Sequence, residues 1–228
     1  MKLVVISPET EDPRELAVMG SLLAAGLERY HVRKPVWSRE QLRHWLTVVP
    51  AEWRPRLVLH QHHQLVDEFG LGGRHWRDMP GNAGGSTAPF LTAALSAPGR
   101  LASRSCHELG ALQAAFDRYD SIFFGPIFPT MSKPGYGPSG SFSPQDVSLL
   151  LRARTAEQRR ASVLALGGIT AETAPRAIAL GFDGVAVLGA IWQSEDPVGV
   201  FTEIRESVRA NRDEPAAAPD HLHSDHAA

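Results

Sequence analysis

The chain has 228 residues, of which 43% are hydrophobic and 21% charged, with 23 Lys and Arg against 25 Asp and Glu. This composition predicts a soluble globular protein, and one domain is the simplest division because α/β barrels of this length are commonly undivided. The formal net charge of -2, without a basic stripe interleaved with aromatic residues, makes nucleic acid an unexpected partner. A membrane is not expected either, because no apolar run is long enough to span one.

The single cysteine, Cys106, rules out an intramolecular disulfide and fits a reducing compartment. Residues 2–7 are strand-like and lack the charged region, apolar run and small-residue cleavage site of a signal peptide. We therefore expect a cytoplasmic protein.

Eight short runs rich in aliphatic, β-branched or aromatic residues recur along the chain at near-regular spacing. They cover residues 2–7, 27–33, 56–60, 72–76, 100–105, 121–127, 162–167 and 184–189. Longer amphipathic segments separate these runs, and such alternation predicts parallel strands joined by helices. Eight repeats favour a single closed (β/α)8 TIM barrel over an open doubly wound sheet.

Two of the segments between the runs carry clear helix boundaries. Ser38 and Gln41 have the spacing of a capping box at the start of a helix. A second helix is expected to begin at a Thr170 cap and to stop at Gly181, where a left-handed residue is needed.

Two stretches depart from the repeating pattern. Residues 77–89 are rich in Gly, Pro and Asn, so the fourth helix is expected to be short or displaced. Apolar periodicity is lost after about residue 211, which predicts a barrel domain over 1–210 and a disordered tail over 211–228. The histidines of this tail could hold a stray metal ion, but a solvated tail is the expected state.

The carboxyl ends of the strands are where a parallel barrel gathers its functional groups. Four histidines lie near such ends: His31, His60, His75 and His107. Imidazole titrates near neutrality, so each could transfer a proton or bind substrate, although each could equally be a packed core residue. We take His60 and His107 as catalytic candidates and His31 as a substrate-binding one.

Other polar residues at the predicted strand ends complete the set of candidates. Lys34 and Gln61 are expected to contact substrate. The remaining candidates are Arg33, Asp78, Ser103, Ser105, Thr130, Ser132 and Lys133.

A metal site built from His60, His62 and His63 is not expected. Their i, i+2, i+3 spacing at a strand-to-helix turn sends the side chains in different directions, and no adjacent carboxylate or cysteine completes a ligand set.

Pairs of small residues follow the last two predicted strands: Gly167-Gly168 and Gly189-Ala190. Glycine lets backbone N–H groups approach an anion closely, and a helix N-terminus adds a favourable dipole. Loops after the last two strands are the usual phosphate site of a barrel, so the two pairs predict a phosphorylated ligand. Either pair alone could equally be a tight turn.

A Pro/Gly/Ser-rich loop over residues 128–143 carries Lys133 in its middle. A loop of this length in a compact domain is usually functional or disordered. Phe128 and Tyr136 flank the lysine and favour docking, so we expect a lid that brings a cation over the barrel mouth.

Six segments carry a resemblance to a known family: YHVRKP (30–35), LGGRHW (71–76), SRSCH (103–107), FFGPIFPTMSK (123–133), LALGGIT (164–170) and GVAVLGAIW (184–192). Together they resemble the thiamine-phosphate synthase and thiazole tautomerase superfamily of (β/α) barrels, over residues 1 to about 208. The resemblance implies synthesis of thiamine phosphate. Hydroxymethylpyrimidine pyrophosphate ionises, the thiazole phosphate nitrogen captures the pyrimidine cation, and Mg²⁺ carries off pyrophosphate.

The resemblance also implies roles for individual residues. Arg33 and Ser105 would contact pyrophosphate, and Lys133 would neutralise the leaving charge. Thr130 and Ser132 would line the thiazole side. Its phosphate would be held by the backbone N–H groups of Gly167, Gly168, Gly189 and Ala190.

The magnesium ligands of the synthases differ here. An Asn-Asp pair usually follows the third strand, where this chain has His60 and Gln61. A Gly-Gln-Glu-Asp run usually follows the fourth strand, and Asp78 is the displaced substitute and the one candidate ligand for Mg²⁺.

The residues leave two alternative functions open. The tautomerase branch, which acts on a thiazole carboxylate phosphate, also lacks those aspartates and carries a His-hydrophobe-Arg motif like His31-Val32-Arg33. Its proton-transferring histidine, however, corresponds to Pro126. A non-catalytic protein that binds thiazole or thiamine phosphate is the third possibility. The expected partners are small phosphorylated molecules, and a homodimer is left open.

Overall fold

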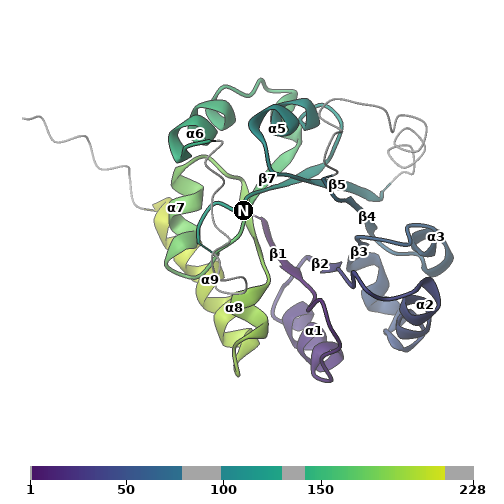
Figure 1. Cartoon of the computed structure of the whole chain (residues 1–228). Coiled ribbons are helices and arrows are strands. Elements are labelled where there is room, and N and C mark those ends of the chain that lie inside the picture. The colour runs from purple at the N-terminus through teal and green to yellow at the C-terminus, as the bar shows by residue number, and fades with distance from the viewer. Residues whose placement is uncertain (1, 79–98, 130–141, 214–228) are drawn as a thin grey trace, which may run out of the picture.

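The computed structural model describes residues 2–78, 99–129 and 142–213 (Figure 1). Its eight parallel strands form a closed barrel in sequence order, with β1 paired to both β2 and β8. The strands are β1 (Lys2–Ile6), β2 (Arg29–Val32), β3 (Leu57–Leu59), β4 (Gly73–Trp76), β5 (Leu101–Cys106), β6 (Ser121–Phe124), β7 (Ser162–Leu166) and β8 (Gly184–Val187). The predicted TIM barrel is confirmed, and all eight predicted strands are present.

Helices surround the barrel, and α9 packs against α1, α7 and α8 (Figure 1). The α-helices are α1 (Glu15–Ala24), α2 (Arg39–Val48), α3 (Leu65–Phe69), α5 (Leu109–Ala115), α6 (Pro144–Arg152), α7 (Thr173–Ala179), α8 (Gly189–Trp192) and α9 (Pro197–Asp213). Two 3-10 helices, Ala51–Arg56 and Gln158–Arg160, precede β3 and β7. Within the described part of the chain, no helix is long and apolar enough to cross a membrane.

Two predicted irregular regions fall largely outside the described residues. The expected short or displaced fourth helix would lie in 79–98, and the expected tail in 214–228. The last described helix, α9, continues to Asp213.

The helix boundaries predicted from the sequence can be compared with the hydrogen bonds and backbone angles of the structure. Ser38 Oγ accepts from the N–H of Gln41 at 3.2 Å, and the Gln41 side chain accepts from the N–H of Ser38 at 2.8 Å, which confirms the capping box. Gly181 follows α7 with a φ of 105°, as its place after a helix requires. Thr170 exchanges side-chain-to-backbone hydrogen bonds with Thr173, and the helix proper begins at Thr173, later than predicted.

Alternation of side chains along the strands separates two packing layers. Outward-pointing strand residues such as Val5 and Val163 pack with the helices in the main core. The barrel interior holds a smaller apolar cluster from β1, β6, β7 and β8, made of Val4, Ile6, Phe123, Leu164 and Ala186. Buried polar side chains lie on the other side, on or directly after β2 to β5: His31, His60, His75 and Ser103. The interior is therefore apolar on one side and polar on the other.

Candidate active site

A pocket of about 310 Å³ opens at the carboxyl end of the barrel strands, the end where TIM barrels hold their active sites. Its floor is apolar, with Ile6, Phe123 and Leu166 among the lining residues. The predicted site residues that line it are Arg33, His60, Asp78, Ser105, His107, Gly167, Gly168, Gly189 and Ala190.

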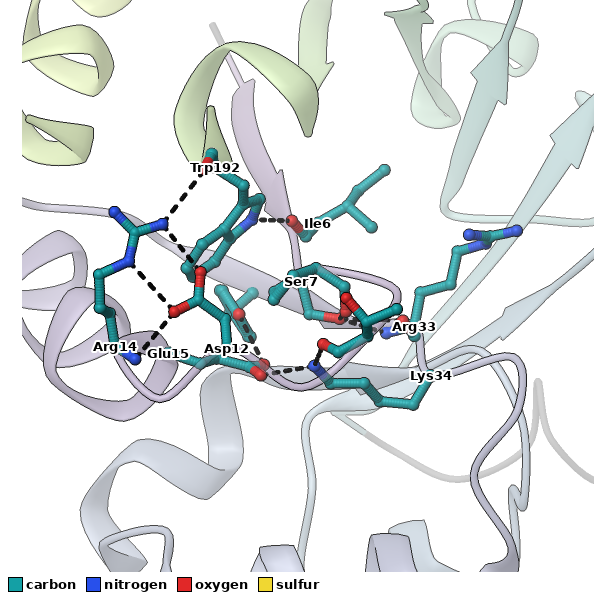
Figure 2. Close-up of polar contacts among 11 residues, drawn as sticks. Ile6, Ser7, Asp12, Arg14, Glu15, Arg33, Lys34 and Trp192 are labelled. Atoms are coloured by element: carbon teal, nitrogen blue, oxygen red, sulfur yellow. Dashed lines mark hydrogen bonds and ion pairs between the residues drawn. The ribbon is translucent and has the colours of Figure 1, made fainter. Parts of the chain in front are cut away.

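Arg33 reaches the pocket from the end of β2, and its backbone is fixed by the buried side chain of Ser7. The N–H of Arg33 donates to Ser7 Oγ at 2.8 Å, and the Ser7 hydroxyl donates back to the Arg33 carbonyl at 3.1 Å (Figure 2). The guanidinium forms an ion pair with Glu9, which also lines the pocket. Such a planar group with several N–H donors suits a phosphate or diphosphate oxygen.

Lys34 does not line the pocket, so the prediction that it binds substrate is not supported. Its fully buried ammonium donates to the Glu15 carboxylate at 2.5 Å and to the Thr10 carbonyl at 2.9 Å (Figure 2). The Tyr30 hydroxyl donates to the other Glu15 oxygen at 2.9 Å. Burial raises the pKa of Glu15, and the Lys34 ammonium opposes that rise. Neighbouring residues of an extended chain point to opposite faces, so Arg33 at the mouth leaves Lys34 directed toward α1.

Three histidines from consecutive strands meet in the polar half of the barrel. His31 lies on β2, His60 directly follows β3 and His75 lies on β4. His31 Nδ1 and His60 Nε2 share a hydrogen bond of 3.1 Å, and the rings of His60 and His75 stack with their centroids 4.0 Å apart. Burial lowers the pKa of all three, that of His31 to about 3, so the imidazoles are neutral near pH 7.

His75 is bound to two serines of β5. Ser103 Oγ donates to the Arg74 carbonyl at 3.2 Å, so it accepts the proton of His75 Nδ1 at 2.9 Å. His75 Nε2 then carries a lone pair, which accepts from the Ser105 hydroxyl at 2.8 Å. Ser105 therefore lines the pocket with its hydroxyl oriented by a neutral imidazole.

His107 and Asp78 line the pocket above β4 and β5. His107 Nδ1 donates to the Gly125 carbonyl at 2.5 Å. Asp78 accepts from the Arg104 guanidinium at 2.9 Å and from the backbone N–H of His107 at 3.1 Å. Both oxygens of this carboxylate are thus already engaged by the protein.

Two other substrate-binding candidates do not line the pocket. The Gln61 side chain donates to the Lys34 carbonyl, which holds it away from the pocket. His31 is fully buried beside His60. The predictions for Gln61 and His31 are therefore not supported by their placement, because local hydrogen bonding and depth keep both from a ligand in the pocket.

His62 and His63 point to different acceptors, the Trp37 and His75 carbonyls, as their spacing predicted. Residues 130–141 of the expected lid lie outside the described residues, and with them three further candidates: Thr130, Ser132 and Lys133.

The two small-residue pairs lie side by side, because β7 and β8 are paired in parallel. Gly168 has a φ of 64°, and a Cβ there would lie 2.4 Å from the Pro129 carbonyl oxygen, so only glycine fits this turn. Gly189 and Ala190 are the first residues of α8, and their N–H groups have no acceptor within the helix. Both turns line the pocket, so their backbone N–H groups lie at its edge.

Among the described residues that line the pocket, the charged side chains of Glu9 and Arg77 were not predicted as site residues. Arg77 directly follows β4 and could have been found by the strand-end rule. Glu9 lies further along the loop after β1, where only the fold shows that the loop turns back over the mouth.

Magnesium does not fit the described residues of this pocket. The ion requires an octahedral shell of oxygen ligands, chiefly carboxylate, phosphate and water. Within the described ranges, Glu9 and Asp78 are the carboxylates that line the pocket, and each is paired with an arginine. The residue after β3 is an imidazole, His60, and Gln61 is turned away.

Polar side chains and backbone donors at the carboxyl end of a closed parallel barrel define a TIM-barrel enzyme. Residues 3–191 match the model of the thiamine monophosphate synthase family, so the chain belongs to this family. The resemblance stated from the sequence is thereby confirmed.

Individual relatives agree with this assignment. The chain is 28% identical over 201 residues to the thiamine-phosphate synthase of Methylobacillus flagellatus, covering 85% of this chain and 88% of the relative. It is 44% identical over 104 residues to that of Methanocella arvoryzae, covering 45% of each chain. The crystal structure of thiamine phosphate pyrophosphorylase from Bacteroides thetaiotaomicron superposes with a TM-score of 0.70 at 24% identity, covering 94% of this chain and 100% of that one. At this identity the superposition supports the fold alone.

Proposed function

We propose that this protein is a thiamine-phosphate synthase that joins hydroxymethylpyrimidine pyrophosphate to a thiazole phosphate and releases pyrophosphate. The observation that carries the proposal is a pocket with anion-binding groups at two separate places. Arg33 and Ser105 lie on the polar side, and the glycine turns after β7 and β8 lie on the other. Two phosphorylated substrates need two such places.

Arg33 would bind the pyrophosphate and stabilise the charge that grows on it as the carbon–oxygen bond breaks. Its fixed backbone and ion pair with Glu9 place the guanidinium before substrate arrives, which is the condition for electrostatic catalysis. Arg77 adds a second cation to the pocket lining. Lys133 stays a predicted third cation.

Ser105 would hydrogen-bond the same group. Its hydroxyl now donates to His75, and rotation about the Cβ–Oγ bond would redirect that proton to an anionic oxygen. The thiazole phosphate would be held by the backbone N–H groups of Gly168, Gly189 and Ala190. The aromatic rings of the two substrates would lie over the apolar floor, between these places.

Tautomerisation is not favoured. Pro126 lines the pocket at the position where that branch carries its proton-transferring histidine, and proline has no titratable group. The relatives compared above are named as synthases.

We also propose that the protein is cytoplasmic. The support is its single cysteine, Cys106, which is a buried free thiol and suits a reducing compartment.

The test is to incubate the purified protein with both substrates, with and without Mg²⁺, and to measure thiamine phosphate by chromatography. We expect turnover, and a loss of about 100-fold or more in Arg33→Ala, because a preorganised charge-stabilising donor is worth that much. Arg43→Ala is the matched control, since this arginine is exposed on α2 and paired with Glu68. Absence of product, or equal rates in Arg33→Ala and Arg43→Ala, would refute the proposal.

A further inference from the structure

Three imidazoles in the barrel interior form a cluster of nitrogen donors that the proposed reaction does not use directly. One ring nitrogen each of His31, His60 and His75 lies within 4.8 Å of the others. The three side chains are buried, and only His60 lines the pocket. We propose that these three histidines bind a divalent transition-metal ion with a preference for imidazole, such as Zn²⁺ or Co²⁺.

The chemistry of the donors selects this class of ion. Neutral imidazoles are poor ligands for Mg²⁺, which prefers oxygen, and good ligands for zinc and its neighbours in the first transition row. Three histidines with an open fourth position are an established zinc arrangement in proteins.

The distances come close to those such a site needs. With metal–nitrogen bonds of 2.0–2.1 Å, two ligands of a tetrahedral ion lie about 3.3–3.4 Å apart. His31 Nδ1 and His60 Nε2 are already 3.1 Å apart, and the proton of their hydrogen bond would move to the other nitrogen of its ring when both bind the ion. The third nitrogen has to approach from at most 4.8 Å, and the rings of His60 and His75, now inclined by 21°, have to turn out of their stack. Both adjustments are side-chain rotations.

Hydrogen bonding around the cluster supports ligation. Ser103 holds the Nδ1 proton of His75, which leaves Nε2 as a lone-pair donor, and metal-bound histidines usually have such a partner on the other nitrogen. Ser105 is the present partner of that lone pair and would release it.

The bound ion would present its open position to the pocket beside His60. Three neutral ligands leave its charge uncompensated, so this position would take hydroxide or another anionic oxygen. Metal binding itself does not depend on the proposed synthase reaction.

The experiment is a titration of the full, untagged chain with Co²⁺ after dialysis against a chelator. His221, His223 and His226 of the C-terminal segment are first replaced by alanine, so that they cannot contribute. We expect one equivalent of Co²⁺ with the visible absorption of a four- or five-coordinate ion, displaced by Zn²⁺ and not by millimolar Mg²⁺.

His60→Gln should weaken binding by at least about 100-fold, since it removes a ligand, whereas removing only a second-sphere partner typically costs 10- to 100-fold. His44→Gln, at an exposed position of α2, is the matched control and should bind normally. If His60→Gln does not fold, paramagnetically shifted imidazole signals of the unsubstituted cluster decide the question, with three histidines expected. Absence of stoichiometric binding, equal affinity in the two variants, or shifted signals from other residues would overturn the proposal.

Discussion

Arg33 and Lys34 are adjacent cations whose surroundings differ completely. Arg33 lines the pocket, whereas Lys34 is fully buried against Glu15, Tyr30 and Thr10. An ion pair at this depth has lost its hydration, and its two charges depend on each other.

Replacing one member of this pair should therefore be costly. We expect Lys34→Met to lower the free energy of unfolding by about 3–5 kcal/mol, because the Glu15 carboxylate is left buried without its partner. The double variant Lys34→Met/Glu15→Leu should recover much of this loss. Urea denaturation measures both, and a single variant as stable as the wild type would contradict the expectation.

Cys106 should be inert toward thiol reagents in the native protein. Burial raises the pKa of its thiol to about 12, so only about one thiol in ten thousand is ionised at pH 8. The rate of reaction with a disulfide reagent should follow unfolding and become fast in urea. Rapid stoichiometric labelling without denaturant would show that the thiol is accessible.

At the level of elements, the turn between β7 and α7 is shaped by contact as well as by backbone conformation. Gly168 and Gly70 have nearly the same φ, 64° and 65°. A Cβ on Gly168 would lie 2.4 Å from the Pro129 carbonyl oxygen, whereas one on Gly70 would meet nothing within 4 Å. Substituting alanine at each glycine therefore separates the destabilisation caused by the backbone conformation from that caused by the contact with Pro129.

Gly70→Ala is expected to lower the free energy of unfolding by about 1–2 kcal/mol, because alanine is strained in the left-handed conformation. Gly168→Ala should cost more, because Pro129 has to move, and it should weaken binding of the thiazole phosphate. Urea denaturation and calorimetric titration measure the two effects. An equal loss of unfolding free energy at both positions would show that the turn after β7 accommodates a Cβ without strain.

The order of the elements could be read from the sequence because each strand is a short apolar run bounded by Gly, Pro or polar residues. The capping box at Ser38 and the glycine at 181 are also predictable, because each depends only on residues that are close in the sequence. The strand-end rule likewise found Arg33, Ser105 and the glycine pairs, since it depends only on position along the chain.

The features that could not be predicted from the sequence depend on side-chain direction and on pairing between distant segments. Lys34 follows a strand like the other candidates, and its buried partner, Glu15, is not visible in the local sequence. His31, His60 and His75 are each recognisable in the sequence by their place near a strand end. That they meet depends on the registers of β2, β3 and β4, which no local pattern specifies.

For the molecule as a whole, the polar half of the barrel interior should make the metal-free protein sensitive to acid. The pKa of His31 falls from 6.5 to about 3 on folding, chiefly through burial. Below pH 6.5 the unfolded chain therefore binds a proton that the folded chain refuses, so stability falls as pH falls. At pH 5 this one group lowers the free energy of unfolding by about 2 kcal/mol relative to pH 8.

Urea denaturation between pH 8 and pH 5, with chelator present, measures this dependence. The difference in unfolding free energy between the two pH values should shrink by about 2 kcal/mol in His31→Gln. The exposed residue His44 provides the control, because His44→Gln should keep the wild-type dependence. An unchanged dependence in His31→Gln would mean that the ring is accessible to protons in the folded state.

The seam between β1 and β8 joins distant parts of the chain. The indole N–H of Trp192 donates to the Ile6 carbonyl at 2.7 Å, across 186 positions of sequence, and Arg14 donates to the Trp192 carbonyl (Figure 2). During translation, β1 emerges first and keeps one edge unpaired until β8 has left the ribosome. An unpaired edge can recruit strands from other nascent chains. Ring closure is thus a late event in biosynthesis, and the interval before it is when this protein is most exposed to misassembly.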